Sequence, residues 1–223
     1  RRVLPRPISA ISHDGKIALS LNFARLQWTR PGYGYAGIDD PFAGEYHPED
    51  GIYLIDLESG EDWRVVSLAD VLALQGKSKE MKNHAVFFNH TLFNADDSRF
   101  AFLVQWRNFL FPRWAKLWRL KTLWRLKTAM FTADVDGSDM RCLIDYGRVS
   151  HFDWRNSREI LVWANIKGRG NKFCLVTDGK DEFRSVGEGA LTQDGHCSFS
   201  PNGRWILIDT YPDNNHYRTL KIF

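Results

Sequence analysis

Four segments of the chain resemble one another, and this internal repeat constrains the fold more than any other feature. Each segment reads as a short strand, a polar turn rich in Asp, Asn, Gly or Ser, and then an apolar strand. The segments are 8–20, 90–104, 151–163 and 196–209. A self-similar all-β unit that recurs every few tens of residues is typical of a β-propeller, in which each unit forms one blade.

Three of these segments lead into or follow a β-hairpin. Alternating apolar residues flank turns at Ser59-Gly60, Asp136-Gly137 and Asp178-Gly179. Such a pair between alternating apolar runs is a strong hairpin signal. An inner pair of strands and an outer hairpin make four strands. The sequence therefore predicts an all-β fold, a β-propeller of four-stranded antiparallel blades.

The repeat predicts a single propeller domain over 1–223, with about three and a half blades. The expected units are about 5–70, 85–148, 149–189 and 190–223. The chain opens abruptly at Arg1 and stops at Phe223 within an expected strand, whereas closed propellers have four to eight blades. We therefore expect a fragment of a longer ring, with a closed four-bladed ring as the alternative.

Two insertions interrupt the repeat. Residues 30–51, rich in Gly, Pro and Tyr, are expected to form a long loop in the first unit. Residues 108–131 interrupt the second and contain the hexapeptide LWRLKT twice, at 117–122 and 123–128. This tandem forms either a basic amphipathic helix that contacts a membrane surface or an acidic polymer, or a surface loop lengthened by duplication. Between the insertions, 67–82 is predicted to form one or two helical turns.

Composition narrows the classes of function. The 223 residues are 43% apolar and 14% aromatic, which favours a globular domain with a sizeable core. The net charge of +3 favours an acidic ligand without requiring one, and we expect no nucleic acid partner. The three cysteines show no framework spacing, which argues against a disulfide scaffold. No apolar run reaches the roughly 18 residues of a transmembrane segment. These features fit a cytoplasmic protein as well as a periplasmic or secreted one.

Three histidines, His90, His151 and His196, stand at the same position of three repeat units. Equivalent positions of successive blades surround the axis of a propeller, so we expect these side chains to converge. Converging imidazoles could bind a metal, or act as a base or proton donor near neutral pH. The alternative is that each histidine caps its blade through a hydrogen bond to a backbone carbonyl.

Polar neighbours support a functional role for the histidines. Asp153 and Asp194 lie close to two of them and could orient their rings. Cys197 could supply a thiolate, but strand alternation points it away from the preceding histidine. Arg107, at the end of a strand, is a candidate for pairing with a substrate carboxylate.

Candidate substrate-binding residues are aromatic or carry amides. Tyr35 and Trp106 could stack on a sugar, although aromatic residues also fit ordinary blade packing. Asn89 directly precedes His90. The stretch 209–213, DTYPD, contains two aspartates and a tyrosine, more polar groups than a plain turn needs.

Longer motifs in the sequence resemble those of known propeller families. The segments DGKIALSL, NADDSRFAFLV and SPNGRWILIDTYPD resemble the repeat of propellers related to the translocation protein TolB. The motifs FNHTLFNADDSRFAFL, VSHFDW and LTQDGHCSFSPNGRWILIDTYPD are similar to the oligogalacturonate-lyase-like propellers, a grouping that includes ulvan lyases. The resemblance covers most of 5–223. It implies a fragment of a seven-bladed ring and lyase chemistry on uronic-acid sugars.

The resemblance also implies a metal. Oligogalacturonate lyases hold a divalent cation with a Gln-x-x-His-x-His element and a histidine from another blade. Gln193 and His196 match the first part, whereas Ser198 stands at the position of the last histidine. His151 or His90 could be the separate ligand. The expected cofactor is Mn, Zn or Ca.

The related ulvan lyases use a histidine and a tyrosine as base and acid, with an arginine that neutralises the substrate carboxylate. Tyr211 and Tyr146 are the nearest candidates for that tyrosine by context.

The leading hypothesis is a polysaccharide lyase that cleaves uronic-acid-containing oligosaccharides or polysaccharides by β-elimination. The expected site residues fall into catalytic, substrate-binding and metal-binding groups. The expected catalytic residues are His90, His151, Arg107 and Tyr211. The expected substrate-binding residues are Asn89, Tyr35 and Trp106. The expected metal ligands are His151, His196 and Gln193. The alternatives are a non-catalytic TolB-like propeller that binds a protein or glycan, and a propeller domain of a hydrolase. The lack of a Gly-x-Ser-x-Gly element in these residues argues against the catalytic part of a hydrolase.

Overall fold

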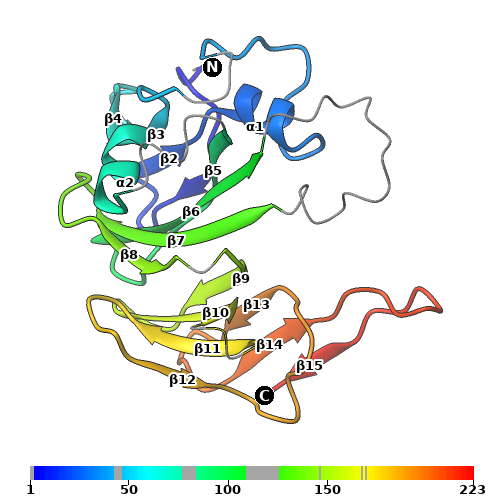
Figure 1. The fold of residues 1–223 in the computed structure, drawn as a ribbon. Coiled ribbons are helices and arrows are strands. Elements are labelled where there is room, and N and C mark those ends of the chain that lie inside the picture. Colours follow the sequence, from blue (N-terminus) through cyan, green and yellow to red (C-terminus); the bar gives the residue numbers. More distant parts are fainter. Residues whose placement is uncertain are drawn as a thin grey trace, which may run out of the picture.

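The structure, a computed structural model, describes residues 3–42, 47–76, 84–108, 126–145, 147–166, 168 and 170–223. Four antiparallel sheets follow one another along the chain (Figure 1). The first three sheets have four strands each, and the fourth has three. The prediction of an all-β propeller built from four-stranded antiparallel blades is confirmed.

The strands of each sheet pair in chain order. The first sheet comprises β1 (Ala10–Ile11), β2 (Ile17–Ser20), β3 (Gly51–Asp56) and β4 (Asp62–Ser67). The second comprises β5 (His84–Phe93), β6 (Arg99–Asn108), β7 (Lys127–Asp134) and β8 (Arg141–Ile144). The third comprises β9 (Val149–Trp154), β10 (Glu159–Asn165), β11 (Asn171–Thr177) and β12 (Phe183–Ser185). The fourth comprises β13 (Cys197–Phe199), β14 (Ile206–Asp209) and β15 (Leu220–Ile222).

Among the described residues, two short helices follow strands of the first sheet, one after β2 and one after β4. Helix α1 (Phe23–Thr29) follows Asn22, whose side chain accepts a hydrogen bond from the backbone of the first turn. The sequence pattern did not predict this helix. Helix α2 (Leu68–Leu74) lies in the stretch predicted to be helical, with Ser67 as its cap. Within the described part of the chain, neither helix is long or apolar enough to cross a bilayer. Residues 77–83 and 109–125, which include most of the LWRLKT tandem, lie outside the described residues.

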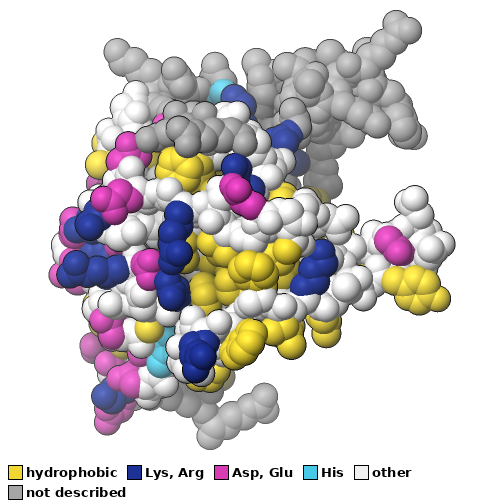
Figure 2. Space-filling model, turned by 90° about the horizontal axis from the view of Figure 1, so that it is seen from below, with side chains coloured by type: hydrophobic (Ala, Val, Ile, Leu, Met, Phe, Trp, Pro, Cys, Tyr) yellow, Lys and Arg dark blue, Asp and Glu magenta, His cyan; other side chains and the backbone are white. Residues whose placement is uncertain are grey.

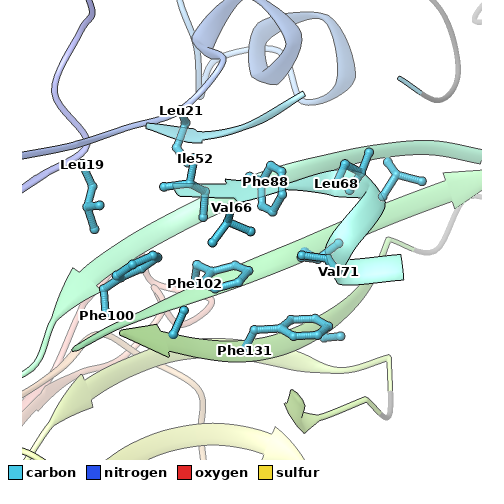
Figure 3. Packing of buried hydrophobic residues seen from close by; sticks show 14 of the residues in the cluster. Leu19, Leu21, Ile52, Val66, Leu68, Val71, Phe88, Phe100, Phe102 and Phe131 are labelled. Carbon is cyan, nitrogen blue, oxygen red and sulfur yellow. The ribbon is translucent and has the colours of Figure 1, made fainter. Parts of the chain in front are cut away.

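The sheets pack face to face, so the middle sheets bury both faces. Along β6, Phe100 and Phe102 belong to the core shared with the first sheet, and Ala101 and Leu103 to the core shared with the third. This explains why the strand reads as an unbroken apolar run rather than an alternating one. Phe102 stacks on Phe131 with ring centroids 5.5 Å apart, and both rings are labelled in Figure 3.

A buried ion cluster ties the first insertion to the second sheet. The Arg25 side chain is fully buried, and its Nε donates to the carbonyl oxygen of Val86 at 2.8 Å. Its guanidinium also pairs with Asp40 at 3.2 Å and with Asp50 at 3.3 Å. Desolvation raises the pKa of Asp50 to about 6, although the Arg25 charge acts in the opposite direction.

The outer face of the fourth sheet carries exposed apolar side chains. Ile206 and Ile208 pack toward the third sheet, and Trp205, Leu207 and Ile222 point the other way and line a shallow apolar groove. Figure 2, which views the molecule from below, shows hydrophobic side chains gathered across this end with Lys and Arg around them.

Phe102→Ala should lower the free energy of unfolding by about 3–5 kcal/mol, because the ring is fully buried among other phenylalanines and leaves a cavity. Urea denaturation measures this loss. Tyr217→Ala removes an aromatic ring that is 71% exposed and should change stability by less than about 0.5 kcal/mol. Equal losses in the two variants would contradict the packing described for the core.

Asp50→Asn should alter the pH dependence of stability. Because the folded pKa of about 6 lies above the ordinary value of 3.8, the protonated carboxyl stabilises the fold at low pH. That contribution is lost as the pH rises through the folded pKa. The stability advantage of wild type over the variant, measured as unfolding free energy, should be about 2 kcal/mol smaller at about pH 7 than at about pH 4. A difference that stays constant would contradict the raised pKa.

Candidate functional site

A β-bulge sets the direction of His90. In the pairing of β5 with β6, Asn89 faces Leu103 and Thr91 faces Phe102, so His90 is the extra residue. Its φ of 47° lies in the left-handed region that side chains rarely adopt. The backbone N–H of His90 donates to Asn89 Oδ1 at 3.0 Å, which stabilises this conformation. A bulge of this kind re-aims a side chain out of the regular alternation.

The same irregularity recurs in the next blade. Two residues of β9, Ser150 and His151, stand opposite the single residue Trp163 of β10. His196 directly precedes β13 at the matching repeat position, and its carbonyl oxygen accepts a hydrogen bond from the backbone of Asp209 at 3.1 Å. The repeat therefore places His90 and His151 at irregularities of an inner strand, and His196 directly before the start of one.

The three histidines line one cavity of about 490 Å³. The ring centroids of His151 and His196 are 4.0 Å apart. Tyr211 lines the same cavity, with its ring centroid 6.0 Å from that of His151. Residues from three different sheets thus meet in one space.

Carboxylates orient two of the imidazoles. His151 Nδ1 lies 3.0 Å from Asp194 Oδ1, and His196 Nδ1 lies 3.1 Å from Asp209 Oδ2. An ionised carboxylate only accepts hydrogen bonds, so each Nδ1 carries a proton, and in the neutral form of each ring Nε2 is the nitrogen with the lone pair. Asp194 fills the orienting role expected for it. Asp153 instead accepts a hydrogen bond from the backbone of β13 at 2.8 Å.

Two groups in the cavity have shifted pKa values. Desolvation, together with the charge of Arg30, lowers the pKa of His90 to about 4, so this imidazole is neutral at neutral pH. Desolvation and the neighbouring Asp194 carboxylate raise the pKa of Tyr211, so the phenol keeps its proton.

Arginines make the cavity attractive to anions. Arg30, Arg148 and Arg218 all line it. The Arg30 guanidinium lies over the Tyr33 ring, 3.6 Å from its centroid. Arg218 lies 3.5 Å from Asp209, the carboxylate that holds His196. Desolvation acts to raise the pKa of Asp209, but its hydrogen bonds from His196 lower it overall.

A buried amide pair supports this wall of the cavity. Asn89 is 3% exposed and donates to Gln105 Oε1 at 3.0 Å. Gln105 Oε1 also accepts a longer hydrogen bond, 3.5 Å, from Arg30. Gln105 itself donates to Thr128 Oγ1 at 3.2 Å. Asn89, expected to bind substrate, thus lies behind the cavity surface and positions His90 and Gln105.

Four other predicted site residues lie away from the cavity wall. Trp106 is 5% exposed and packs in the core, so it presents no face for stacking on a sugar. Tyr35 stacks on a phenylalanine of α1 with ring centroids 5.0 Å apart. Neither Arg107 nor Gln193 lines the histidine cavity, and Gln193 lines an adjoining one. Tyr146 lies outside the described residues.

The donor set for a metal is incomplete in the described residues. No group of three or more His, Cys, Asp or Glu among them is placed to hold an ion. Burial raises the pKa of the Cys197 thiol, which disfavours a thiolate ligand. The divalent cation expected at His151, His196 and Gln193 stays a prediction.

None of the three cavity arginines was among the site residues expected from the sequence. Arg148 precedes β9 by one residue, and Arg218 lies in the loop between β14 and β15. Position close to the repeat histidines is the signal that could have indicated Arg148. No local pattern marks Arg218, because its place in the cavity depends on how its loop folds.

Comparison with known proteins identifies the fold of this chain and nothing further. No protein-family model matches the chain, and no curated protein matches it. The structure is similar to TolB from Acinetobacter baumannii, with a TM-score of 0.51 and 14% identity over 98% of this chain and 40% of that chain. It is similar to the acylaminoacyl peptidase of Pyrococcus horikoshii, with a TM-score of 0.52 and 17% identity over 96% of this chain and 29% of that chain.

Oligogalacturonate lyase in complex with manganese gives a TM-score of 0.48 and 13% identity over 82% of this chain and 43% of that chain. The TolB and peptidase similarities show a TolB-type propeller fold. This chain spans less than half the length of either protein.

Nuclear magnetic resonance should find the ring protons of His90 titrating with a midpoint of about 4. Arg30→Gln should raise this midpoint toward 6.5, because the variant removes a positive charge that disfavours the imidazolium. Arg204→Gln removes an arginine from a different groove and should leave the midpoint unchanged. A wild-type midpoint close to 6.5 would contradict the site electrostatics.

Proposed function

We propose that this chain carries the site of a polysaccharide lyase that cleaves uronic-acid-containing glycans by β-elimination. The reaction needs a base to take the C5 proton, positive charge to neutralise the uronate carboxylate, and a proton for the leaving oxygen. One observation carries the proposal: groups suited to all three tasks line a single cavity. The motif resemblance to oligogalacturonate-lyase-like propellers supports the same reaction class.

The uronate carboxylate is bound by arginine. Guanidinium groups bind carboxylates bidentately and keep their charge at any working pH. Arg30 and Arg148 are the best candidates, because they line the cavity and Arg218 already pairs with a carboxylate. Arg107, the arginine expected from sequence, does not line the cavity, so we assign it no contact with substrate.

His151 is the proposed base. Its Nδ1–H donates to Asp194, which leaves Nε2 free to accept the C5 proton. The Asp194 carboxylate then stabilises the imidazolium that forms. His90 is less suited to this task, because its pKa of about 4 makes it a weak base. Its neutral imidazole avoids adding positive charge beside the arginines.

Tyr211 is the proposed acid. Its raised pKa keeps the phenol protonated at neutral pH, so it can donate to the leaving oxygen. Its ring lies 6.0 Å from the His151 ring, centroid to centroid, which places acid and base within reach of one sugar residue.

The test is turnover on uronate glycans, followed by the ultraviolet absorbance of the unsaturated uronate product. His151→Ala and Tyr211→Phe should each lower kcat by about 10²–10⁴-fold, as expected for loss of a general base or acid. His13→Ala is the matched control, because His13 also contacts a carboxylate, Asp97, at 2.7 Å but does not line the cavity. It should retain wild-type turnover.

Near-full turnover of His151→Ala on a verified substrate would overturn the assignment of the base. Binding of uronate oligosaccharides by wild type without any unsaturated product would identify a non-catalytic glycan-binding propeller instead.

A further inference from the structure

A second cavity of about 430 Å³ adjoins the histidine cavity. Asp194 and Tyr211 line both, so the two form one continuous binding surface. The second cavity is bounded by the loop between β14 and β15 and by the segment that precedes β13; the two strands and their loop extend to the right in Figure 1. A glycan chain that places one sugar against the histidines would place a neighbouring sugar here.

The two cavities differ in charge. Arg30, Arg148 and Arg218 line the first. The second contains the carboxylates of Asp194 and Asp213, and its described lining residues include no lysine or arginine. An anionic sugar is therefore attracted by the first cavity and repelled by the second.

The second cavity has the groups that recognise an uncharged sugar. Tyr211 is 55% exposed and Tyr217 is 71% exposed, so both rings can offer an apolar face with a hydroxyl beside it. Gln193 and Thr219 add neutral hydrogen-bonding side chains. A few polar groups around aromatic surface are typical of small-ligand sites.

Internal hydrogen bonds hold this loop in shape. Asp213 Oδ1 accepts from the backbone N–H groups of Asn215 at 2.8 Å and Tyr217 at 3.0 Å. Thr210 Oγ1 accepts from the backbone of Thr219 at 2.9 Å. Tyr217 therefore lies on a loop whose shape is fixed by internal hydrogen bonds.

We infer that the second cavity is a subsite for a neutral sugar, adjacent to the uronate that the proposed function places at the histidines. The inference rests on that proposed function and specifies its substrate class. The preferred glycan is a heteropolymer in which a uronate is linked to an uncharged sugar. A homopolymer of uronates places a carboxylate beside Asp194 and Asp213 and binds less well.

Isothermal titration calorimetry on the complete chain carrying His151→Ala, which is expected to slow turnover, tests the inference. The probes are a tetrasaccharide that alternates glucuronate with a neutral hexose, a tetrasaccharide of galacturonate, and glucuronate alone. The alternating tetrasaccharide should bind about tenfold more tightly than the galacturonate one, because a like-charge contact is avoided.

Two further variants isolate the subsite. Asp213→Asn removes the charge but keeps the Oδ1 acceptor that holds the loop, and it should reduce the preference to about threefold or less. Tyr217→Ala should weaken binding of the alternating tetrasaccharide about tenfold and leave binding of glucuronate unchanged.

The outcomes separate the two proposals. If neither tetrasaccharide nor glucuronate binds, the proposed function fails, and the subsite fails with it. If uronates bind but galacturonate tetrasaccharide binds as tightly as the alternating one or more tightly, only the neutral subsite is overturned. An unchanged preference in Asp213→Asn overturns it as well.

Discussion

Burial of both faces of each middle sheet is the constraint on which the rest of the structure depends. A strand such as β6 must supply apolar side chains in both directions, and Phe102 and Ala101 serve two different cores. Sheets packed face to face lie at a spacing set by their side chains, about 10 Å. Successive inner strands are thereby brought alongside one another. Residues at equivalent repeat positions then meet on the same side of the stack, although they are distant in sequence.

The bulges turn that general property of the fold into a site. Regular alternation would send a strand residue to one sheet face or the other, and both faces are occupied by neighbouring sheets. At His90 and His151 an extra residue breaks the alternation, which frees the side chain to enter the cavity. The positive φ of His90 is the local strain that this arrangement requires.

The balance of positive and negative side chains around the cavity determines its chemical properties. Desolvation, together with the charge of Arg30, lowers the pKa of His90 to about 4, which is why this imidazole is neutral. Two carboxylates, Asp194 and Asp209, offset part of this charge and hold the other two histidines. The same carboxylate, Asp194, faces the adjoining cavity. Asp194 therefore contributes negative charge to both cavities.

The sequence alone determined the repeat, the hairpins, the propeller class and the shared position of three histidines, because periodicity and turn chemistry are local properties. Only the tertiary structure decided which other side chains line the cavity with these histidines. Gln105 and Trp106 are adjacent on β6, yet one lines the cavity and the other is buried in the core. Arg148 and Arg218 line the histidine cavity from separate segments. Such meetings depend on strand register, bulges and the packing of whole sheets, which no short stretch of sequence encodes.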